Sequence, residues 1–556
     1  MKCAERKGER NIYSCTFVPA HEGIFFYRFE VDYPSGDFHY IGRGELGNAV
    51  FGEFLPEWQL TVFSKNYVTP ARSGADIIYH IFVDRFCKEG EMLTPRFGVS
   101  KKWKEEVTII DPDGAYRAND YYGGNLKGII SKLDYLESLG VTIIYLSPIF
   151  MANSNHRYDT ADYMSIEPMI GSEEDLKELI AKAKALGIGI MLDGVFNHSG
   201  SDSIYFNKHG HFDSVGAYQS KDSPYYNWYH FIDYPEVYES WWGITVVPTL
   251  NKTSKSLRKF LFGKGGVVEK WTSFGVSWRL DVVDELPIDF VDEMRTAIKM
   301  TNPDSIVLGE VWEDASHKYS YDILRPYFTK GQLDGVMNYP FKDAIISFSL
   351  KADTFAFIRD VMNIVENYPE QSLASCMTML GSHDTERILN VLAETGGEHW
   401  RKDKQLRYRL GEENMLIAVK RLKIAAALEY TLPGIPSIYY GDEVGMQGFK
   451  DPINRRTFPW GEENAEILGY YKKLGNIRKN NPKALSGRIS FANSDLLIMK
   501  RGSGDDALII VANPTNCCAA FPNKTRMKEL ITDIIFEEEE IIIGAYGIMI
   551  LQITEK

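Results

Sequence analysis

Over most of the chain, short runs of apolar residues alternate with segments in which apolar residues recur every three or four positions. The runs that predict buried strands are 77–82, 142–146, 188–192, 276–280, 305–308, 335–337, 377–380 and 435–439. Each run is followed by a segment that can form a helix, so the pattern predicts eight βα units. Eight such units favour a closed (β/α)8 TIM barrel of the α/β class over an open sheet.

Two of the intervening segments carry clear helix signals. Apolar residues at 129, 133, 136 and 139 predict one helix over 126–139. Ser172 precedes an acidic turn that ends in Asp175, which is the pattern of a capping box, and Gly187 marks the end of that helix.

The pattern changes at both ends of the chain and once in the middle. Residues 1–70 are rich in aromatic and β-branched residues, and predict a short N-terminal β module that is small for a core of its own. Residues 483–556 predict an antiparallel β-sandwich. Residues 200–262 are aromatic and irregular, and predict a subdomain inserted after the third strand of a barrel that spans 71–480.

The net charge of the chain limits the classes of partner that it can bind. Asp plus Glu number 76 and Lys plus Arg 62, so the net charge of −14 disfavours nucleic acid and anionic membranes and favours a neutral substrate. No apolar run reaches the about 18 residues of a membrane span, and the charged N-terminus does not have the form of a secretory signal. The six cysteines form no CxxC pair, which favours a reducing cytoplasm.

Polar residues follow the predicted strands in one register. They are Asp193, Asn197 and His198 after the third strand, Arg279 and Asp281 at the end of the fourth, Glu310 after the fifth, and His383 and Asp384 after the seventh. The C-terminal ends of barrel strands meet at one mouth, so we expect these side chains to lie together. Each motif alone also fits a structural ion pair, a cap or a loop, but their common position favours chemistry.

The residue types at this mouth indicate glycoside hydrolysis, which needs an ionised carboxylate and a protonated acid on opposite sides of the scissile bond. Arg279 and Asp281 are two positions apart, so both face the same side of their strand. The guanidinium is therefore expected to hold Asp281 ionised. A metal site built from Asp193, His198 and His383 is an alternative that this chemistry does not need.

These motifs resemble those of the α-amylase family of glycoside hydrolases, in particular its neopullulanase, cyclomaltodextrinase and maltogenic amylase branch. Four segments resemble the four motifs of the family in order: 193–198 (DGVFNH), 276–285 (VSWRLDVVDE), 309–312 (GEVW) and 380–387 (LGSHDTER). Segments 121–126, 155–163, 440–443 and 451–455 also match the branch, so the resemblance runs from about 58 to 460.

The resemblance implies a retaining hydrolase that cleaves α-1,4-glucosidic bonds of maltooligosaccharides, cyclodextrins or starch fragments through a covalent glycosyl-enzyme intermediate. It implies that Asp281 is the nucleophile, that Glu310 is the acid and then the base, and that Asp384 grips sugar hydroxyls. The other residues that it implies in substrate binding are Tyr158, Asp193, Asn197, His198, Arg279, Glu285, His383, Asp451 and Arg455.

The sequence departs from the branch in its short N-terminal module, in Thr249 where lysine is usual, and in Val283 and Asp284 where Ala-Asn is commoner. The balance of α-1,4 and α-1,6 cleavage therefore stays open, and the alternative function is an α-glucanotransferase or an α-1,6-oligoglucosidase on the same scaffold. The module usually helps to form a dimer in this branch, so a monomer and a homodimer both remain open.

A rival of a different class is a non-catalytic binding protein, because some barrel relatives have lost their carboxylates. The intact set Asp281, Glu310 and Asp384 disfavours that rival.

The chemistry requires no cofactor. Some relatives bind structural calcium near the first barrel strand, so calcium stays open. Asp111, Asp113, Asn119 and Asp120 lie in that region without a clear motif.

Overall fold

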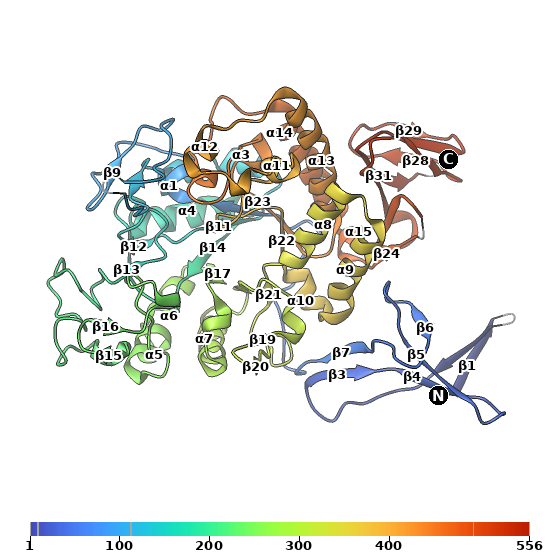
Figure 1. The fold of residues 1–556 in the computed structure, drawn as a ribbon, viewed down its shortest axis with the longest axis horizontal. Coiled ribbons are helices and arrows are strands. Elements are labelled where there is room, and N and C mark those ends of the chain that lie inside the picture. The colour runs from blue at the N-terminus through green and yellow to red at the C-terminus, as the bar shows by residue number, and fades with distance from the viewer. Residues whose placement is uncertain (1, 8–9, 112–113, 493, 555–556) are drawn as a thin grey trace.

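The computed structural model describes residues 2–7, 10–111, 114–492 and 494–554, and describes side chains from Tyr13 onward. Its centre is an eight-stranded parallel sheet enclosed by helices (Figure 1). The barrel strands are β8 (Ile78–Ile81), β11 (Ile143–Leu146), β14 (Gly189–Gly194), β17 (Ser277–Leu280), β18 (Val307–Gly309), β21 (Gly335–Val336), β22 (Met377–Met379) and β23 (Ile435–Tyr439). The eight predicted strands and the predicted fold class are confirmed.

The sheet closes on itself. Its strand order is β21-β18-β17-β14-β11-β8-β23-β22, and the two end strands meet through a parallel bridge between Met337 and Met377. Large apolar side chains such as Tyr145, Met191 and Leu308 fill the interior. The barrel is thus a packed core rather than a pore, and ligands are confined to its ends.

Helices cover the outside of the barrel. They are α1 (Val83–Phe86), α2 (Leu126–Ile130), α3 (Leu133–Ser138), α4 (Glu173–Ala185), α5 (Lys255–Phe262), α6 (Val267–Thr272), α7 (Ile288–Thr301), α8 (Tyr339–Lys351), α9 (Thr354–Asn367), α10 (Glu370–Ser375), α11 (Ile388–Leu392), α12 (Lys402–Arg407), α13 (Glu412–Thr431), α14 (Ala465–Asn480) and α15 (Pro482–Ser486). The predicted capping box is confirmed, because the Ser172 and Asp175 side chains accept from each other's backbone N–H groups at the start of α4.

The prediction of one helix over 126–139 is wrong, because α2 and α3 are separated at Ser131 and Lys132. The Ser131 hydroxyl donates back to the Gly128 carbonyl at 2.8 Å, which competes with helix continuation. Gly128 also lies directly against the backbone of Cys87, where a Cβ would be 2.0 Å from the carbonyl oxygen. The spacing of apolar residues, on which the prediction of one helix was based, contains no information about this close backbone contact.

The loop between β14 and β17 forms the insertion. Its irregular part contains the short strands β15 (Phe231–Asp233) and β16 (Val237–Tyr238) and is held by aromatic contacts, such as that of Phe206 with Tyr238 at 4.7 Å. Helix α5 follows at Lys255 and packs against α7 through Phe262 and Phe290, whose rings are 4.8 Å apart. Residues 255–262 therefore lie in the helical layer of the barrel.

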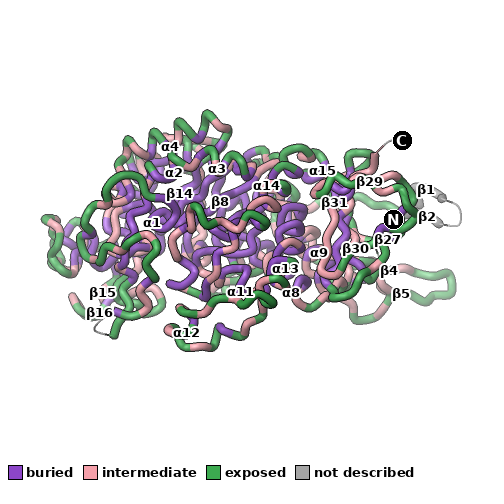
Figure 2. Tube along the Cα trace, turned by 90° about the horizontal axis from the view of Figure 1, so that it is seen from above, coloured by how far each residue is buried: buried purple, intermediate pink, exposed green. Residues whose placement is uncertain are grey.

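The N-terminal β module has no core of its own. Its strands are β1 (Lys2–Lys7), β2 (Arg10–Ser14), β3 (Gly23–Tyr27), β4 (Phe29–Asp32), β5 (Phe38–Arg43), β6 (Ala49–Phe51) and β7 (Trp58–Val62). Among its described side chains, none of the hydrophobic ones before Tyr67 is buried (Figure 2). The module instead leans on α9, where Thr61 donates to the Asn367 carbonyl at 2.6 Å and Arg43 pairs with Glu366 at 2.9 Å.

The C-terminal segment is a β-sandwich with its own core. One sheet has the order β24-β25-β26-β31-β28-β29, and the second pairs β27 with β30. These strands are β24 (Ile489–Phe491), β25 (Leu497–Arg501), β26 (Leu508–Asn513), β27 (Ala519–Pro522), β28 (Met527–Glu529), β29 (Ile535–Phe536), β30 (Glu540–Ile543) and β31 (Gly547–Ile553). Buried Val511, Phe521 and Ile543 join the two sheets.

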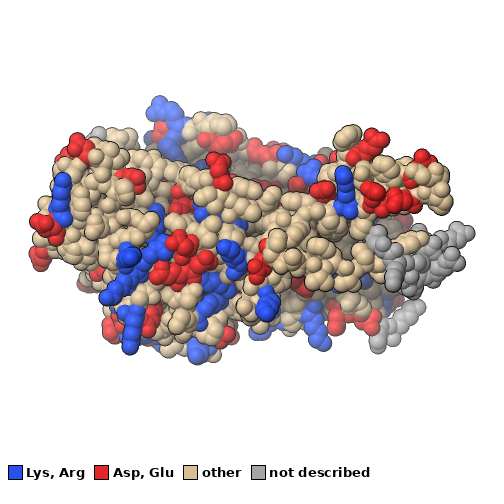
Figure 3. All heavy atoms as spheres, turned by 90° about the horizontal axis from the view of Figure 1, so that it is seen from below, with Lys and Arg blue, Asp and Glu red and all other residues tan. Residues whose placement is uncertain are grey.

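Within the described ranges, no helix is both long and apolar enough to cross a bilayer. Acidic and basic side chains are interspersed over a largely neutral surface on the face in Figure 3.

A buried arginine joins the last helices of the barrel to its first strand. Arg478 of α14 is 2% exposed and donates to the backbone carbonyls of Asp76, Tyr430 and Gly434 at 2.8, 2.7 and 2.5 Å. Asp76 lies just before β8, and Gly434 just before β23, so the guanidinium holds the place where these neighbouring strands enter the barrel.

Replacement of Arg478 by Met should destabilise the barrel, because one buried and two partly buried carbonyl oxygens lose their donor. We expect a loss of about 3 kcal/mol and a fall of several degrees in thermal midpoint at fixed scan rate. Arg488→Met, at an exposed arginine, is the matched control and should leave the midpoint unchanged. Equal midpoints for the two variants would contradict this account of closure.

Candidate active site

A cleft with a volume of about 700 Å³ opens at the C-terminal mouth of the barrel. Nine of the residues predicted for the site line it: Tyr158, His198, Asp281, Glu285, Glu310, His383, Asp384, Asp451 and Arg455. The other three, Asp193, Asn197 and Arg279, are buried behind its wall. The structure therefore brings all twelve to one end of the barrel, in two layers.

The inner layer is organised by the Arg279 guanidinium, which is fully buried at the end of β17. Its Nη1 donates to Asp193 at 2.8 Å and to Asp281 at 2.9 Å, and its Nη2 pairs with Glu310 at 2.9 Å. These carboxylates come from or directly after three neighbouring strands, β14, β17 and β18. One cation thus holds Asp281 and Glu310 side by side at the floor of the cleft.

Asp193 has no oxygen free for a ligand. Besides Arg279, the hydroxyls of Tyr145 and Tyr158 donate to its Oδ2 at 2.7 and 2.8 Å. The carboxylate is therefore a fixed anchor that orients Arg279 from below and the Tyr158 ring from the side.

The backbone between the two floor carboxylates is strained. Val282 follows Asp281 directly and has φ 40° and ψ 50°, a left-handed conformation that is costly for a β-branched residue. This conformation turns the Val282 N–H toward Glu310, to which it donates at 2.9 Å. Arg279 and this N–H together fix Oε2 of Glu310, whose Oε1 accepts from Trp312 at 3.1 Å.

The cleft carries more acid than base. Four carboxylates, those of Asp193, Asp281, Glu310 and Asp384, surround Arg279, and burial raises the pKa of Asp281 well above its ordinary value. Arg279 opposes this rise, whereas the neighbouring carboxylates add to it. Arg279 thus favours the ionised form of Asp281 as expected, but the guanidinium is divided among three carboxylates, and burial outweighs its effect on the pKa.

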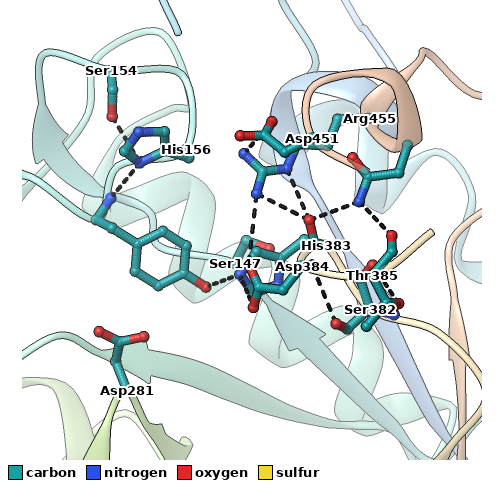
Figure 4. Close-up of polar contacts among 12 residues, drawn as sticks. Ser147, Ser154, His156, Asp281, Ser382, His383, Asp384, Thr385, Asp451 and Arg455 are labelled. Atoms are coloured by element: carbon teal, nitrogen blue, oxygen red, sulfur yellow. Dashed lines mark hydrogen bonds and ion pairs between the residues drawn. The ribbon is translucent and has the colours of Figure 1, made fainter. Parts of the chain in front are cut away.

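A second group of polar side chains follows β22 and lines another part of the cleft (Figure 4). Nε2 of His383 lies 2.7 Å from the Tyr158 hydroxyl and 3.1 Å from Asp384. The single Tyr158 proton is engaged with Asp193, so Nε2 of His383 is the donor in both contacts. Arg455 donates to the His383 carbonyl at 2.9 Å and pairs with Asp451 at 2.9 Å, which fixes the outer rim.

The histidines of the cleft are neutral. Burial lowers the pKa of His156 and of His198 to about 3, and that of His383 to well below its ordinary value. Each ring therefore offers one donor and one acceptor near neutral pH, which suits uncharged hydroxyl groups.

A buried lysine fixes the tautomer of His198. The Lys252 ammonium donates to Oδ1 of Asn197 at 2.5 Å, so the Asn197 amide must direct its Nδ2 toward Nδ1 of His198, 3.2 Å away. Nδ1 then accepts, and the proton of the ring sits on Nε2. Lys252 is only 9% exposed, and burial lowers its pKa to about 8.

Aromatic residues of the outer cleft escaped the sequence prediction. Trp241 stacks on His198 at 5.2 Å, and Trp242 stacks on Trp241 at 4.9 Å. Trp242 and Tyr321 donate to the two oxygens of Glu285 at 3.3 and 2.7 Å. The Trp-Trp pair in an aromatic insertion was a usable signal, whereas Tyr321 stands in a hairpin that no motif marks.

Two of the four candidates for calcium near the first barrel strand, Asp111 and Asp120, are already engaged by protein donors. The Asp120 carboxylate already accepts from Arg85 at 2.9 Å, from Asn155 at 2.7 Å and from the Thr108 N–H at 2.8 Å. Asp111 pairs with Arg117 at 3.4 Å, and Asp113 lies outside the described residues. Among the described residues, no three His, Cys, Asp or Glu side chains gather as metal ligands.

Comparisons with known proteins show what the chain is similar to. Residues 80–473 match the family described as alpha amylase, catalytic domain. The chain is 36% identical over 516 residues to an amylopullulanase of Thermoanaerobacter thermohydrosulfuricus, a match that covers 82% of the chain and 33% of the relative. It is 34% identical to a cyclomaltodextrinase of Geobacillus thermopakistaniensis, with 80% and 69% covered.

The solved structures include the type III pullulan hydrolase from Thermococcus kodakarensis, with a TM-score of 0.74 at 27% identity. That match covers 93% of this chain and 88% of the other. The chain spans only 27% to 40% of the length of three amylopullulanases that it matches.

Removal of the Asp384 charge should stabilise the protein at alkaline pH. Burial and the nearby Glu310 raise the pKa of Asp384 from 3.8 to about 7. The stability linked to its proton is complete below pH 4 and is lost as the pH rises through 7. Asp384→Asn should therefore raise the thermal midpoint at pH 8 by about 1–2 °C, with no gain near pH 4.

The matched control is Asp289→Asn, at an exposed carboxylate on α7. It should show the same midpoint difference at both pH values. A constant difference for Asp384→Asn as well would contradict the raised pKa.

Proposed function

The chain belongs to the α-amylase family of glycoside hydrolases, and from that membership we propose that it hydrolyses α-1,4-glucosidic bonds with retention of the anomeric configuration. The substrates proposed are maltooligosaccharides, cyclodextrins or starch fragments. One observation carries the proposal: Asp281 and Glu310 are held on a single guanidinium at the floor of a polar cleft. This closeness supports the short carboxyl separation, about 5–5.5 Å, that retention requires.

In the first step a carboxylate oxygen of Asp281 attacks the anomeric carbon of the sugar. Protonated Glu310 gives its proton to the glycosidic oxygen, the bond from that oxygen to the anomeric carbon breaks, and the leaving sugar departs as an alcohol. In the second step Glu310, now ionised, takes a proton from water. The water oxygen attacks the anomeric carbon, the ester to Asp281 breaks, and the α anomer is released with Glu310 protonated again.

The surplus of carboxylates supports this chemistry electrostatically. Positive charge develops on the sugar ring in the transition state, and the cleft holds acidic groups before that charge appears. Binding of a cationic transition state lowers the cost of ionising Asp281 beside Glu310 and Asp384. The raised pKa of Asp281 in the free protein is thus relieved at the moment of reaction.

The remaining cleft residues bind the sugar that forms the ester. Tyr158 offers a ring face beside the floor, Asp384 offers an acceptor and His198 a donor to sugar hydroxyls, and His383 lines the cleft while its Nε2–H holds Tyr158 and Asp384 in place. Asp451 and Arg455 at the outer rim serve the next sugar along the glycone. Asp193, Asn197 and Arg279 act as positioning residues, because their side chains are buried behind the wall.

The choice of an α-glucan rests on the relatives, which are named amylopullulanase, cyclomaltodextrinase and pullulan hydrolase. A cytoplasmic site of action remains part of the proposal. The five cysteines with described side chains are all free, which supports a reducing compartment.

The proposal is tested by incubating the protein with linear, cyclic and branched glucans and following the products by proton NMR. We expect α-anomeric products at early times. Asp281→Asn should lower kcat by at least about 10³-fold because the nucleophile is lost, while the fold is retained. Asp289→Asn, on the surface of α7, is the matched control and should turn over normally.

Three results would overturn the proposal. Early β-anomeric products would mean inversion, wild-type turnover by Asp281→Asn would remove the nucleophile, and inactivity on every glucan would refute the substrate class. Longer products from maltotriose would favour transfer over hydrolysis.

The contacts that run from Lys252 through Asn197 to His198 give a separate prediction. Lys252→Met leaves the Asn197 amide free to rotate, so His198 loses its fixed tautomer, and kcat/KM for maltotriose should fall about 10-fold. Nitrogen-15 NMR of the His198 ring should show a change in the balance of tautomers. Lys255→Met, three residues along at an exposed position, should change neither quantity. An unaltered His198 tautomer in Lys252→Met would contradict the claim that Lys252 fixes this tautomer through Asn197.

A further inference from the structure

A second groove lies beside the cleft, between the N-terminal β module and helices α8 and α9. It has a volume of about 1040 Å³. Arg43, Val50 and Leu55 of the module line one side, and Ser347 of α8 with Asn363 of α9 line the other. Figure 1 shows the module, in blue, alongside these helices, in yellow.

The groove and the cleft meet on one loop. Trp312 and Glu313, which follow β18, line both of them. The Trp312 ring is stacked on Tyr339 with centroids 3.9 Å apart, so one face is held while the side chain remains 46% exposed. A ligand that leaves the cleft over this ring enters the groove without crossing a separate wall.

The position of Glu310 indicates on which side of the scissile bond the groove lies. Trp312 donates to Glu310, and under the proposed function Glu310 protonates the leaving oxygen. The loop 310–314 therefore borders the leaving-group side of the scissile bond. Under the proposed function Tyr158 and Asp451, which also line the cleft, serve the glycone side.

The wall that the module supplies is fixed in place. Gln59 donates to Ser316 at 2.9 Å, and Arg43 pairs with Glu366 at 2.9 Å. Gly47 lies so close to Glu366 that a Cβ there would be 2.2 Å from a carboxylate oxygen. The groove thus has two rigid sides, which limits the entropy lost when a chain is bound.

The chemistry of the groove suits an uncharged, hydroxyl-rich chain. Arg359 and Asp360 of α9 pair at 2.8 Å and remain 46% and 43% exposed, and the lining as a whole has five carboxylates to two guanidiniums, so acceptors for hydroxyl groups predominate. The excess of carboxylates would repel a polyanion, and an apolar peptide would need a more continuous apolar wall.

We propose that this groove extends the cleft on the leaving-group side and holds sugar units of a long α-glucan beyond those bound at the floor. The proposal rests on the proposed function for its direction and ligand class. Its volume exceeds that of sites that hold one drug-sized ligand, so it accommodates more than one sugar unit. The module then serves the enzyme as a wall of the substrate path.

The test compares kcat/KM for long linear amylose with kcat/KM for maltotriose, which is too short to reach the groove from the floor. Ser347→Trp fills the groove from α8 and should lower kcat/KM for amylose about 5-fold more than for maltotriose. Asn363→Ala, which removes a polar group, should shift the ratio in the same direction about 2-fold. Ser138→Trp, at an exposed serine on α3, is the matched control and should leave the ratio unchanged.

An unchanged ratio in both groove variants overturns the groove as a binding site, while turnover of maltotriose still supports the proposed function. Inactivity of the wild-type protein on both substrates overturns the proposed function instead. If Ser347→Trp fails to fold, Asn363→Ala and Arg359→Ala decide the question by the same ratio.

Discussion

The arrangement of the site depends on one buried guanidinium. Arg279 is inaccessible to solvent and binds three carboxylates from three neighbouring strands. An isolated charge in such a place would be very costly, so the acids and the cation require each other. Because a guanidinium is planar and its donors point in set directions, it also fixes the angles between its partners. The barrel supplies the strand spacing, and Arg279 converts that spacing into a defined separation of side chains.

The same constraint explains why the surrounding groups form two layers. Asp193 and Tyr145 have their polar atoms engaged by protein, because Tyr145 donates to the same carboxylate that anchors Arg279. Residues of the outer layer keep one polar atom for the cleft. The strained backbone at Val282 belongs to the inner layer, since its N–H donates to Glu310. Strain is tolerated there because the buried ion pairs on both sides restrict the alternatives.

Much of this arrangement follows from local pattern. Apolar runs and strand-end polar residues predict the eight strands and the meeting of Asp281 and Glu310, because a parallel barrel leaves few other placements. The features that the sequence did not predict depend on contacts between residues that are distant in sequence. The break between α2 and α3 comes at Ser131, whose hydroxyl donates back to Gly128 where Gly128 lies against Cys87, and the raised pKa of Asp281 follows from burial and from acids on other strands. Lys252 and Tyr321 carry no motif, and only the folded chain brings them to Asn197 and Glu285.

The coreless N-terminal module has a consequence for how this protein changes over evolutionary time. Its strands bury no hydrophobic side chain among those described, so their order derives from docking onto α9 rather than from internal packing. Sequence changes on its exposed loops therefore place little demand on the stability of the barrel. A surface of this kind can diverge quickly while the catalytic floor stays constant, and it lets the reach of the protein along a polymer vary independently of its chemistry.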